Sequence, residues 1–269
     1  MEHLVKRSIA TIHARFHEPL SLDDLAHSAM ISKFYFLRLF RRVTGVTPGR
    51  FLSAVRLHEA KRLLLSTSLN VADVSAEVGY SSTGTFSRRF SESVGISPTR
   101  YRRLQHADGS LPPEHTRNGN ATASLTGVLN FAGAPDSAVY LGLFSSPILQ
   151  GYPVATATAT APGVYQMRNI PSGTWYLHAV SRVADSSQGP HPEAPILIDR
   201  AGPLRFSANT SLTTDLFLQP SDWTRPPILF ALTGLDPLPC APGPVPPVPL
   251  VRVPSQPRRP RRVSHAMAL

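Results

Sequence analysis

Apolar residues in the first 105 positions recur three and four residues apart, which is typical of amphipathic helices. Residues 22–29 show this spacing after Ser21, a residue type favoured at helix N-caps. Residues 32–43 show it again, beginning at Ser32, and Gly45 supplies a stop signal. The pattern predicts two short helices separated by a tight turn. A further amphipathic helix is expected over residues 3–17.

The same pattern returns 50 residues later. Asn70 precedes an apolar run at helical spacing, a second helix is expected to begin at Ser81 or Ser82, and Gly95 ends it. The pairs that keep this offset are Ser32 and Ser82, Arg38 and Arg88, Phe40 and Phe90, Gly45 and Gly95, Pro48 and Pro98, and Arg50 and Arg100. The chain therefore begins with one unit built twice. Two helices joined by a tight turn form the helix-turn-helix layout, whose second helix enters the DNA major groove.

A long helix is predicted between the two copies. Thr47 suits its N-cap, Pro48 suits its first turn, and apolar positions continue to Ser66. At about 1.5 Å per residue this helix would span roughly 28 Å. Major grooves on one face of DNA repeat every ~34 Å. A connecting helix of this length would therefore set the two second helices about one DNA turn apart.

Beyond residue 121 the helical period disappears and short β-rich segments alternate with turn signals. The segments are residues 122–131, 138–144, 154–160, 163–169, 174–182 and 210–218. Several short strands at such spacing predict an all-β antiparallel sandwich over residues 122–222. Residues 106–121, which are polar and contain Gly and Pro-Pro, are expected to form a linker. The fold class is thus multidomain, all-α followed by all-β.

The C-terminal segment, residues 223–269, is rich in proline and arginine. Its residues from 224 onward hold 12 of the 27 prolines, so we expect disorder or polyproline II structure. Two arginine pairs, Arg258-Arg259 and Arg261-Arg262, lie in it. They would add nonspecific attraction to DNA, or the segment is a solvated tail without function.

Charge is unevenly placed along the chain. Residues 1–105 hold 16 basic and 8 acidic residues, residues 106–223 hold 5 and 8, and residues 224–269 hold 6 and 1. A basic N-terminal region is the footprint of phosphate binding, the alternative being a merely soluble basic surface. The lone Cys240 excludes a disulfide within one chain. No long apolar run and no signal-peptide pattern occur, so a cytoplasmic protein is expected.

The residues that repeat also carry a resemblance. LDDLAHSAMISKFYFLRLFRRVTGVTP, VRLHEAKRLLLSTSLNVADVSAEVGY and SSTGTFSRRFSESVGISPTRYRR resemble the DNA-binding domain of AraC/XylS-family transcription regulators, over about residues 1–104. The resemblance implies that residues 32–43 and 82–94 are recognition helices. The DNA-binding positions it implies are Ser32, Lys33, Phe34, Leu37, Arg38, Arg41, Arg42, Ser82, Thr83, Gly84, Ser87, Arg88 and Arg89.

Arginine chemistry separates these positions further. Arg38 and Arg88 are candidates for base-edge contacts, because arginine is the usual bidentate reader of guanine. The candidates for phosphate contacts, or for plain surface charge, are Arg41, Arg42, Arg50, Lys61, Arg89, Arg100, Arg102 and Arg103. The second copy departs from the family pattern, with Ser91-Glu92 where the first keeps Arg41-Arg42. We therefore expect the first recognition helix to contribute more of the specific DNA affinity than the second.

The resemblance implies a transcription regulator of the nucleoid, an activator or a repressor. Its implied partners are double-stranded DNA and RNA polymerase, together with a small-molecule effector, a second copy of the chain or another protein at the sandwich. Residues 122–182 more weakly resemble carboxypeptidase-regulatory-like, transthyretin-type sandwich domains, which implies a fold and no activity. An alternative is a carbohydrate- or peptide-binding sandwich tethered to DNA.

Few residues of the predicted sandwich suggest chemistry. His178 is a candidate ligand contact or a half-buried structural histidine, and Tyr140, Tyr165, Trp175 and Tyr176 would line a binding face or fill the core. No Ser/His/Asp set, paired carboxylates or phosphate-binding loop has usable spacing. We therefore predict no enzyme activity and no cofactor. His13 and His17 lie four residues apart but lack a third metal ligand, so no metal site is expected.

Overall fold

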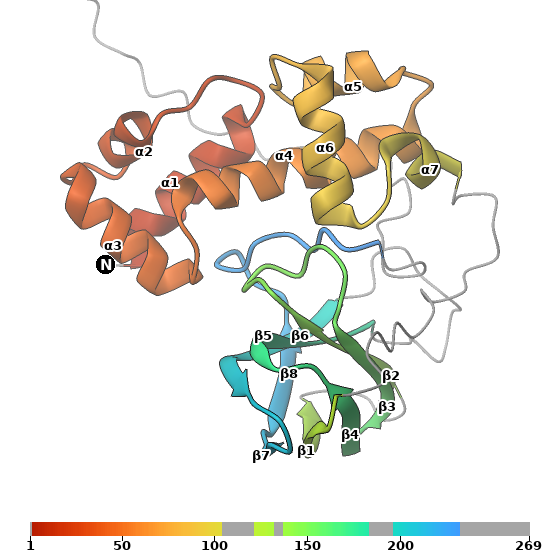
Figure 1. Cartoon of the computed structure of the whole chain (residues 1–269). Coiled ribbons are helices and arrows are strands. Elements are labelled where there is room, and N and C mark those ends of the chain that lie inside the picture. The colour runs from red at the N-terminus through yellow and green to blue at the C-terminus, as the bar shows by residue number, and fades with distance from the viewer. Residues whose placement is uncertain (1, 104–120, 132–136, 183–195, 232–269) are drawn as a thin grey trace, which may run out of the picture. The chain divides into compact units, whose positions relative to one another are not determined.

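A computed structural model describes residues 2–103, 121–131, 137–182 and 196–231 (Figure 1). The helical region, residues 2–103, contains α1 (Glu2–Arg15), α2 (Leu22–Ser28), α3 (Lys33–Thr44), α4 (Pro48–Ser66), α5 (Val71–Glu77), α6 (Thr83–Val94) and α7 (Pro98–Arg103). Almost all of the predicted linker and residues 232–269 of the predicted tail lie outside the described residues. No helix in the described ranges is long and apolar enough to cross a membrane.

Local signals place the helix ends where the sequence predicts them. Ser21 caps α2, and its side chain and that of Asp24 form a reciprocal capping box. Thr47 caps α4, and its side chain accepts a hydrogen bond from Arg50 N. Pro48 occupies the first turn of the same helix. Gly45 and Gly95 end α3 and α6 in the left-handed conformation, with φ of 77° and 94°. The two helix-turn-helix copies therefore share the same stop signal.

The repeat extends into the core. Helices α3 and α6 each contribute two aromatic rings that pack edge-on or tilted against each other, and the helix that follows each contributes a third. In the first copy the ring centroids are 5.5 and 5.6 Å apart, and in the second 5.6 and 5.7 Å. The rings are Phe36, Phe40 and Phe51 in the first copy and Phe86, Phe90 and Tyr101 in the second, all fully buried. Helix α4 links the two small cores into one cluster.

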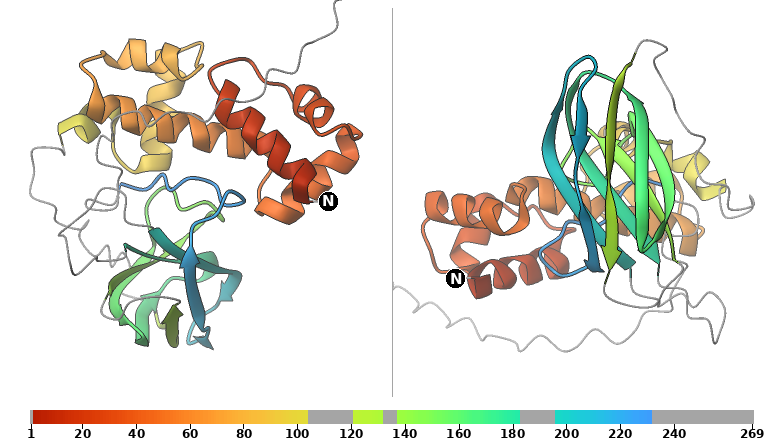
Figure 2. Two further views of the ribbon diagram at one scale, coloured as in Figure 1. Left: turned by 180° about the vertical axis from the view of Figure 1, so that it is seen from behind. Right: turned by 90° about the horizontal axis from the view of Figure 1, so that it is seen from below.

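The described residues between 121 and 220, called here the sheet region, contain eight strands. They are β1 (Ala123–Phe131), β2 (Ser137–Phe144), β3 (Ala155–Ala161), β4 (Gly163–Ile170), β5 (Gly173–Arg182), β6 (Ile196–Phe206), β7 (Ser211–Thr213) and β8 (Leu216–Pro220). The hydrogen-bonded order is β3-β2-β5-β6-β8-β1-β4, with β7 beside β1. Figure 2 shows the strands curving round a common interior.

The predicted antiparallel sandwich needs correction. The strands follow one continuous, nearly closed sheet instead of two separate sheets, and β1 pairs in parallel with both β7 and β8. Strand β6 was not predicted, and the strand expected over 210–218 is divided into β7 and β8 around Thr214-Asp215. Tyr140 and Tyr165 belong to the interior, since they are 6% and 2% exposed.

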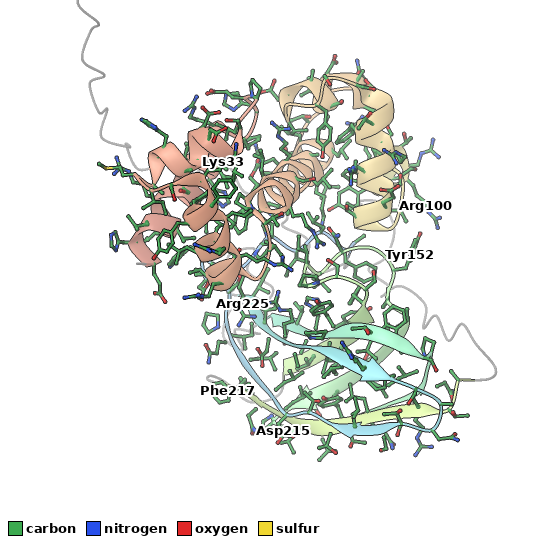
Figure 3. All side chains as sticks on the ribbon, turned by 60° about the vertical axis from the view of Figure 1, so that its left-hand side comes forward. Lys33, Arg100, Tyr152, Asp215, Phe217 and Arg225 are labelled. Carbon is green, nitrogen blue, oxygen red and sulfur yellow. The ribbon has the colours of Figure 1, made fainter. Side chains whose placement is uncertain are left out.

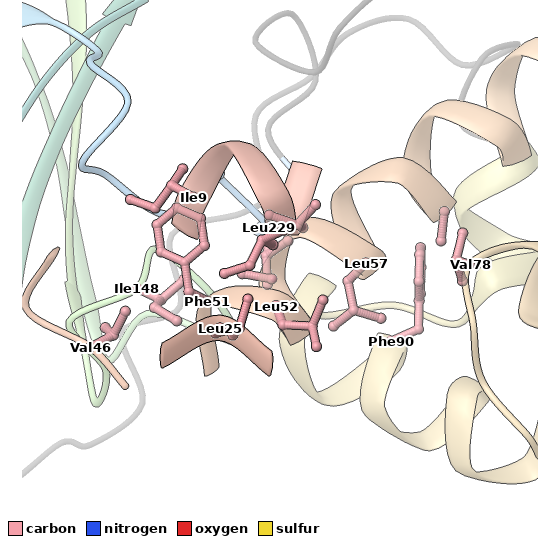
Figure 4. Packing of buried hydrophobic residues seen from close by; sticks show 14 of the residues in the cluster. Ile9, Leu25, Val46, Phe51, Leu52, Leu57, Val78, Phe90, Ile148 and Leu229 are labelled. Carbon is pink, nitrogen blue, oxygen red and sulfur yellow. The ribbon is translucent and has the colours of Figure 1, made fainter. Parts of the chain in front are cut away.

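The predicted start of the tail is also wrong. Residues 222–231, called here the strap, lie within the described residues and pack against the helical region. Leu229 and Ala231 belong to the buried helical cluster together with Ile148, and Trp223 packs against it (Figure 4). Leu229 N and Phe230 N both donate to Leu149 O, at 3.0 and 3.1 Å. The apolar residues that follow Pro226-Pro227 are therefore buried in the helical core. A solvated tail would leave them exposed.

Candidate nucleic-acid interface

Helix α3 presents a basic surface. It contains Lys33, Arg38, Arg41 and Arg42 and no acidic residue. Lys33 Nζ lies 2.8 Å from Asp23 Oδ2 on α2, which holds that cation at the first turn of α3. Figure 3 shows Lys33 at the surface of the helical region. The helix therefore offers several exposed cations to a polyanion.

Apolar groups accompany these cations. Phe34 is 79% exposed although it lies in the first turn of α3. Met30, in the turn before the helix, is also 79% exposed and has a positive φ of 58°. Apolar contacts with thymine methyl groups are one means of reading bases in the major groove. The exposed ring of Phe34 suits such a contact.

Helix α6 is the structural equivalent of α3 but carries less positive charge. Its charged residues are Arg88, Arg89 and Glu92, and Glu92 Oε1 lies 3.8 Å from Arg88 NH1. Ser82 caps the helix by accepting from Thr85 N at 3.4 Å, whereas Ser32 makes no side-chain cap bond to α3. The acidic departure noted in the sequence thus lies directly against the predicted base-reading arginine of α6.

The predicted DNA-binding residues form two sets, one on α3 and one on α6 with their N-caps. Leu37 and Ser87 are half-buried, and the others are exposed in the full chain. The described parts of the sheet region therefore leave these side chains uncovered. Their contact with DNA stays a prediction.

Three predicted phosphate contacts have structural partners instead. Lys61 is fully buried, donates to Phe230 O at 3.4 Å and lies 5.5 Å from the ring centroid of Tyr101. Arg102 donates to Leu64 O at 3.2 Å and to Leu69 O, at the end of α4. Arg50 NH2 donates to Ser146 Oγ at 2.8 Å. Arg50 is nevertheless exposed, as are Arg41, Arg42, Arg89, Arg100 and Arg103.

One basic residue was missed. Arg56 on α4 donates from Nε to Phe16 O and from NH2 to Glu18 O, both at 2.7 Å, and burial lowers the pKa of its guanidinium. It lines a groove of about 540 Å³ between α4 and α6, together with Arg50 and Arg89. Nothing in the local sequence indicated that Arg56 would fix the end of the α1 segment.

Backbone contacts join the sheet region to the last turn of α6. A helix leaves its final carbonyl groups without partners inside the helix. Here the partners come from the loop of residues 145–153 and from the strap. Gly151 N donates to Ser93 O at 2.6 Å, Ala231 N donates to Val94 O at 3.1 Å, and Tyr152 OH donates to Gly95 O.

The sheet region also reaches the end of α3. A Cβ placed on Gly45 would lie only 2.7 Å from Arg200 NH2, so the guanidinium of Arg200 rests against this glycine. Arg200 lies on β6. Both second helices of the repeat therefore end against residues from the same sheet region.

Among the described residues, no group of three or more His, Cys, Asp and Glu side chains is placed to hold a metal ion. The ring of His13 packs edge-on against Phe51, with centroids 6.3 Å apart, and burial lowers the pKa of His13. The ring of His17 packs edge-on against Phe16. These two histidines therefore make structural contacts within the helical region.

Comparison with known proteins places residues 25–104 in a family model described as a helix-turn-helix domain. The HTH-type transcriptional activator AarP of Providencia stuartii is 31% identical over 37% of this chain and 73% of its own length. The transposon Tn10 TetD protein of Escherichia coli is 34% identical over 37% of this chain and 72% of its own length. Against three longer curated relatives, the chain spans 35–42% of their length.

Solved structures include a transcriptional regulator with an AraC-type DNA-binding domain from Chromobacterium violaceum. It is 28% identical, covers 40% of this chain and 96% of its own, and superposes with a TM-score of 0.39.

Proposed function

Since the chain belongs to the AraC/XylS family of helix-turn-helix transcriptional regulators, we propose that it binds double-stranded DNA specifically through α3 and α6. The observation that carries the proposal is the duplicated unit, whose two second helices both keep their predicted DNA-binding side chains at the surface. The bound chain then regulates transcription, through contact with RNA polymerase or by blocking it.

The connecting helix supports a two-groove site. Helix α4 has 19 residues, which corresponds to roughly 28 Å at about 1.5 Å per residue. Its two ends carry the two helix-turn-helix copies, and successive major grooves lie ~34 Å apart. We infer that α3 and α6 enter adjacent major-groove segments on one face of the duplex.

Helices α3 and α6 contribute unequally to specific DNA affinity in this proposal. Arg38 on α3 makes no hydrogen bond or ion pair within the described residues, so its guanidinium is available for a guanine edge. Arg88 on α6 already has Glu92 at 3.8 Å. Arg41 and Arg42 add phosphate neutralisation at the end of α3 that α6 lacks. We therefore propose that α3 supplies most of the specific affinity.

The sheet region is proposed as the regulatory module. Contacts at Gly45 and at the last turn of α6 connect it to both recognition helices. A ligand, a second copy of the chain or another protein bound to the sheet region would act on the readers through these contacts.

A binding experiment with the full chain tests the DNA proposal. Sites selected from random DNA are measured against unrelated DNA across a range of salt concentrations. The logarithm of affinity should fall with the logarithm of salt by about 0.9 for each phosphate contact. A salt-independent affinity would contradict the proposal.

Two substitutions locate the readers. Arg38→Ala should weaken specific binding by about 1–3 kcal/mol, with a smaller loss for Arg88→Ala, while nonspecific binding is largely kept. Arg205→Ala, at an exposed position of β6, is the matched control and should change neither affinity. If specific and nonspecific affinities drop together, the arginines contact phosphate instead of bases. A larger loss from Arg88→Ala would overturn the proposed dominance of α3.

A further inference from the structure

A cavity of about 190 Å³ lies where the sheet region meets the end of α3. Its walls come from five separate segments: the last residues of α3, the loop after β2, strand β5, strand β6 and the strap. The polar side chains among its lining residues include His178, Arg200 and Arg225. None of these three residues belongs to the proposed DNA-binding surface.

The guanidinium of Arg200 is held at one wall. NH1 donates to Pro147 O at 2.6 Å, and NH2 rests against Gly45. Burial, followed by the nearby positive charge of Arg225, lowers the pKa of Arg200. A guanidinium carries five N–H donors, and this one makes a single side-chain hydrogen bond within the described residues. A partly buried cation with unused donors suits an anionic ligand.

Arg225 provides a second cation. Its NH2 lies 3.8 Å from Asp199 Oδ1, and the side chains are 29% and 22% exposed. Asp199 compensates it weakly, because this carboxylate also accepts from Arg200 N at 2.7 Å and from Phe217 N at 2.9 Å. Figure 3 labels Arg225 at the start of the strap. Two guanidinium groups thus line the cavity, whereas Asp199 is not among its lining residues and already accepts from two backbone amides.

His178 supplies an acceptor. It is 2% exposed, and its Nε2 lies 3.0 Å from Ser146 O. Burial and the two arginines lower its pKa to about 4, so the ring is neutral near pH 7. A carbonyl only accepts, so Nε2 must carry the hydrogen and Nδ1 must be the unprotonated nitrogen. Nδ1 is buried and has no partner among the described residues, which is a costly arrangement.

We propose that this cavity binds a small dicarboxylate that carries a hydroxyl group. The two carboxylates pair with Arg200 and Arg225, and the hydroxyl donates to His178 Nδ1. The size agrees, since a cavity of about 150 Å³ accommodates benzene, and a four-carbon hydroxy-dicarboxylate is only slightly larger. Bidentate pairing with carboxylates is the geometry that guanidinium groups favour.

Ligand binding at this site affects helix α3, which is proposed to bind DNA. This step rests on the proposed function. Arg200 lies at the C-terminal end of α3, where the helix dipole favours a cation. A carboxylate bound to the same guanidinium draws it away from Gly45. The ligand therefore alters the support of α3, the helix that carries most of the cationic surface.

Calorimetric titration of the full chain with L-malate tests the site without DNA. Arg200→Gln and Arg225→Gln should each weaken malate binding at least tenfold, and Arg205→Gln, on the same strand but outside the cavity, should leave it within twofold. Arg225→Gln is the more direct test of ligand binding, because Arg200 also packs against Gly45 of the helical region and its substitution can disturb folding. Helical circular dichroism confirms that each variant is folded.

Succinate, which lacks the hydroxyl group, separates the two parts of the proposal. It should bind the unmodified chain several-fold more weakly than malate. Equal binding of the two acids would remove the role of His178. No binding of malate, or an equal loss in the Arg205→Gln control, would overturn the site. Malate binding by a chain that fails to bind selected DNA would leave the site standing and reject the proposed function, so the two failures are distinguishable.

Discussion

Leu229→Ala tests whether the strap is an integral part of the helical core. Leu229 is 1% exposed and belongs to the same buried cluster as the cores of both helix-turn-helix copies. Its backbone hydrogen bond to Leu149 O is unaffected by the substitution. The change therefore removes side-chain packing alone, at a position far along the chain from the helices whose buried residues share this cluster.

The expected cost follows from burial. Leucine-to-alanine changes in protein cores cost about 2–5 kcal/mol, and the cost rises with the cavity that remains. Leu229 lies on a single extended segment that can move inward to close part of that cavity. We therefore expect a loss of about 2–3 kcal/mol. This is a large fraction of the 5–15 kcal/mol that stabilises a typical domain.

Urea unfolding measures the effect, with helical circular dichroism reporting on the helices and tryptophan fluorescence, in a Trp175→Phe background, reporting on Trp223 in the strap. Phe217→Ala is the control, since Phe217 is a large apolar residue of β8 that is 48% exposed, and it should cost under about 1 kcal/mol. A Leu229→Ala loss below about 0.5 kcal/mol, the range of surface substitutions, would show that the strap does not stabilise the helices.

Two further predictions concern charge. Glu92→Gln should tighten DNA binding several-fold at low salt in a mobility-shift titration, because it frees Arg88 and removes one repulsive charge; an unchanged affinity would reject the inhibitory role of Glu92. The pKa of His58 on α4 is lowered to about 4 by desolvation and by the charge of Lys61, and that of His178 is also about 4. The unfolded chain therefore binds more protons than the folded chain below about pH 6.5. Stability should therefore fall from pH 6.5 towards 4, by at most about 1.4 kcal/mol per pH unit for each histidine. Urea midpoints across this range check it, and a flat profile would contradict the lowered pKa values of the two histidines.

The features that the sequence predicted depend on residues close together in the chain. A cap such as Thr47 acts on an amide three residues away, and Gly45 and Gly95 act at the helix ends they occupy. The repeat doubled every such signal, so one copy supported the other. For the same reason helices α3 and α6, and the exposure of most of the side chains predicted to bind DNA, were predictable.

The features that were missed depend on distant contacts. Strand β6 contains Asp199-Arg200 and Gly202-Pro203, so it lacks the apolar alternation of a half-buried strand, and its pairing with β5 and β8 decides its conformation. The burial of Lys61 depends on Phe230, 169 residues away. Charge and amphipathic position alone favoured a surface lysine.

The same distant contacts bear on how the two readers are spaced. Helix α4 connects the end of the first helix-turn-helix copy to the start of the second and so sets the distance between them. Gly151, Tyr152 and Ala231 hold the last carbonyls of α6, and Arg200 rests against the glycine that ends α3. Because these four residues belong to one sheet region and its strap, they form a second connection between the readers, independent of α4. A movement of these four residues would therefore change the support of α3 or α6, even though none of the four is among the predicted DNA-binding residues.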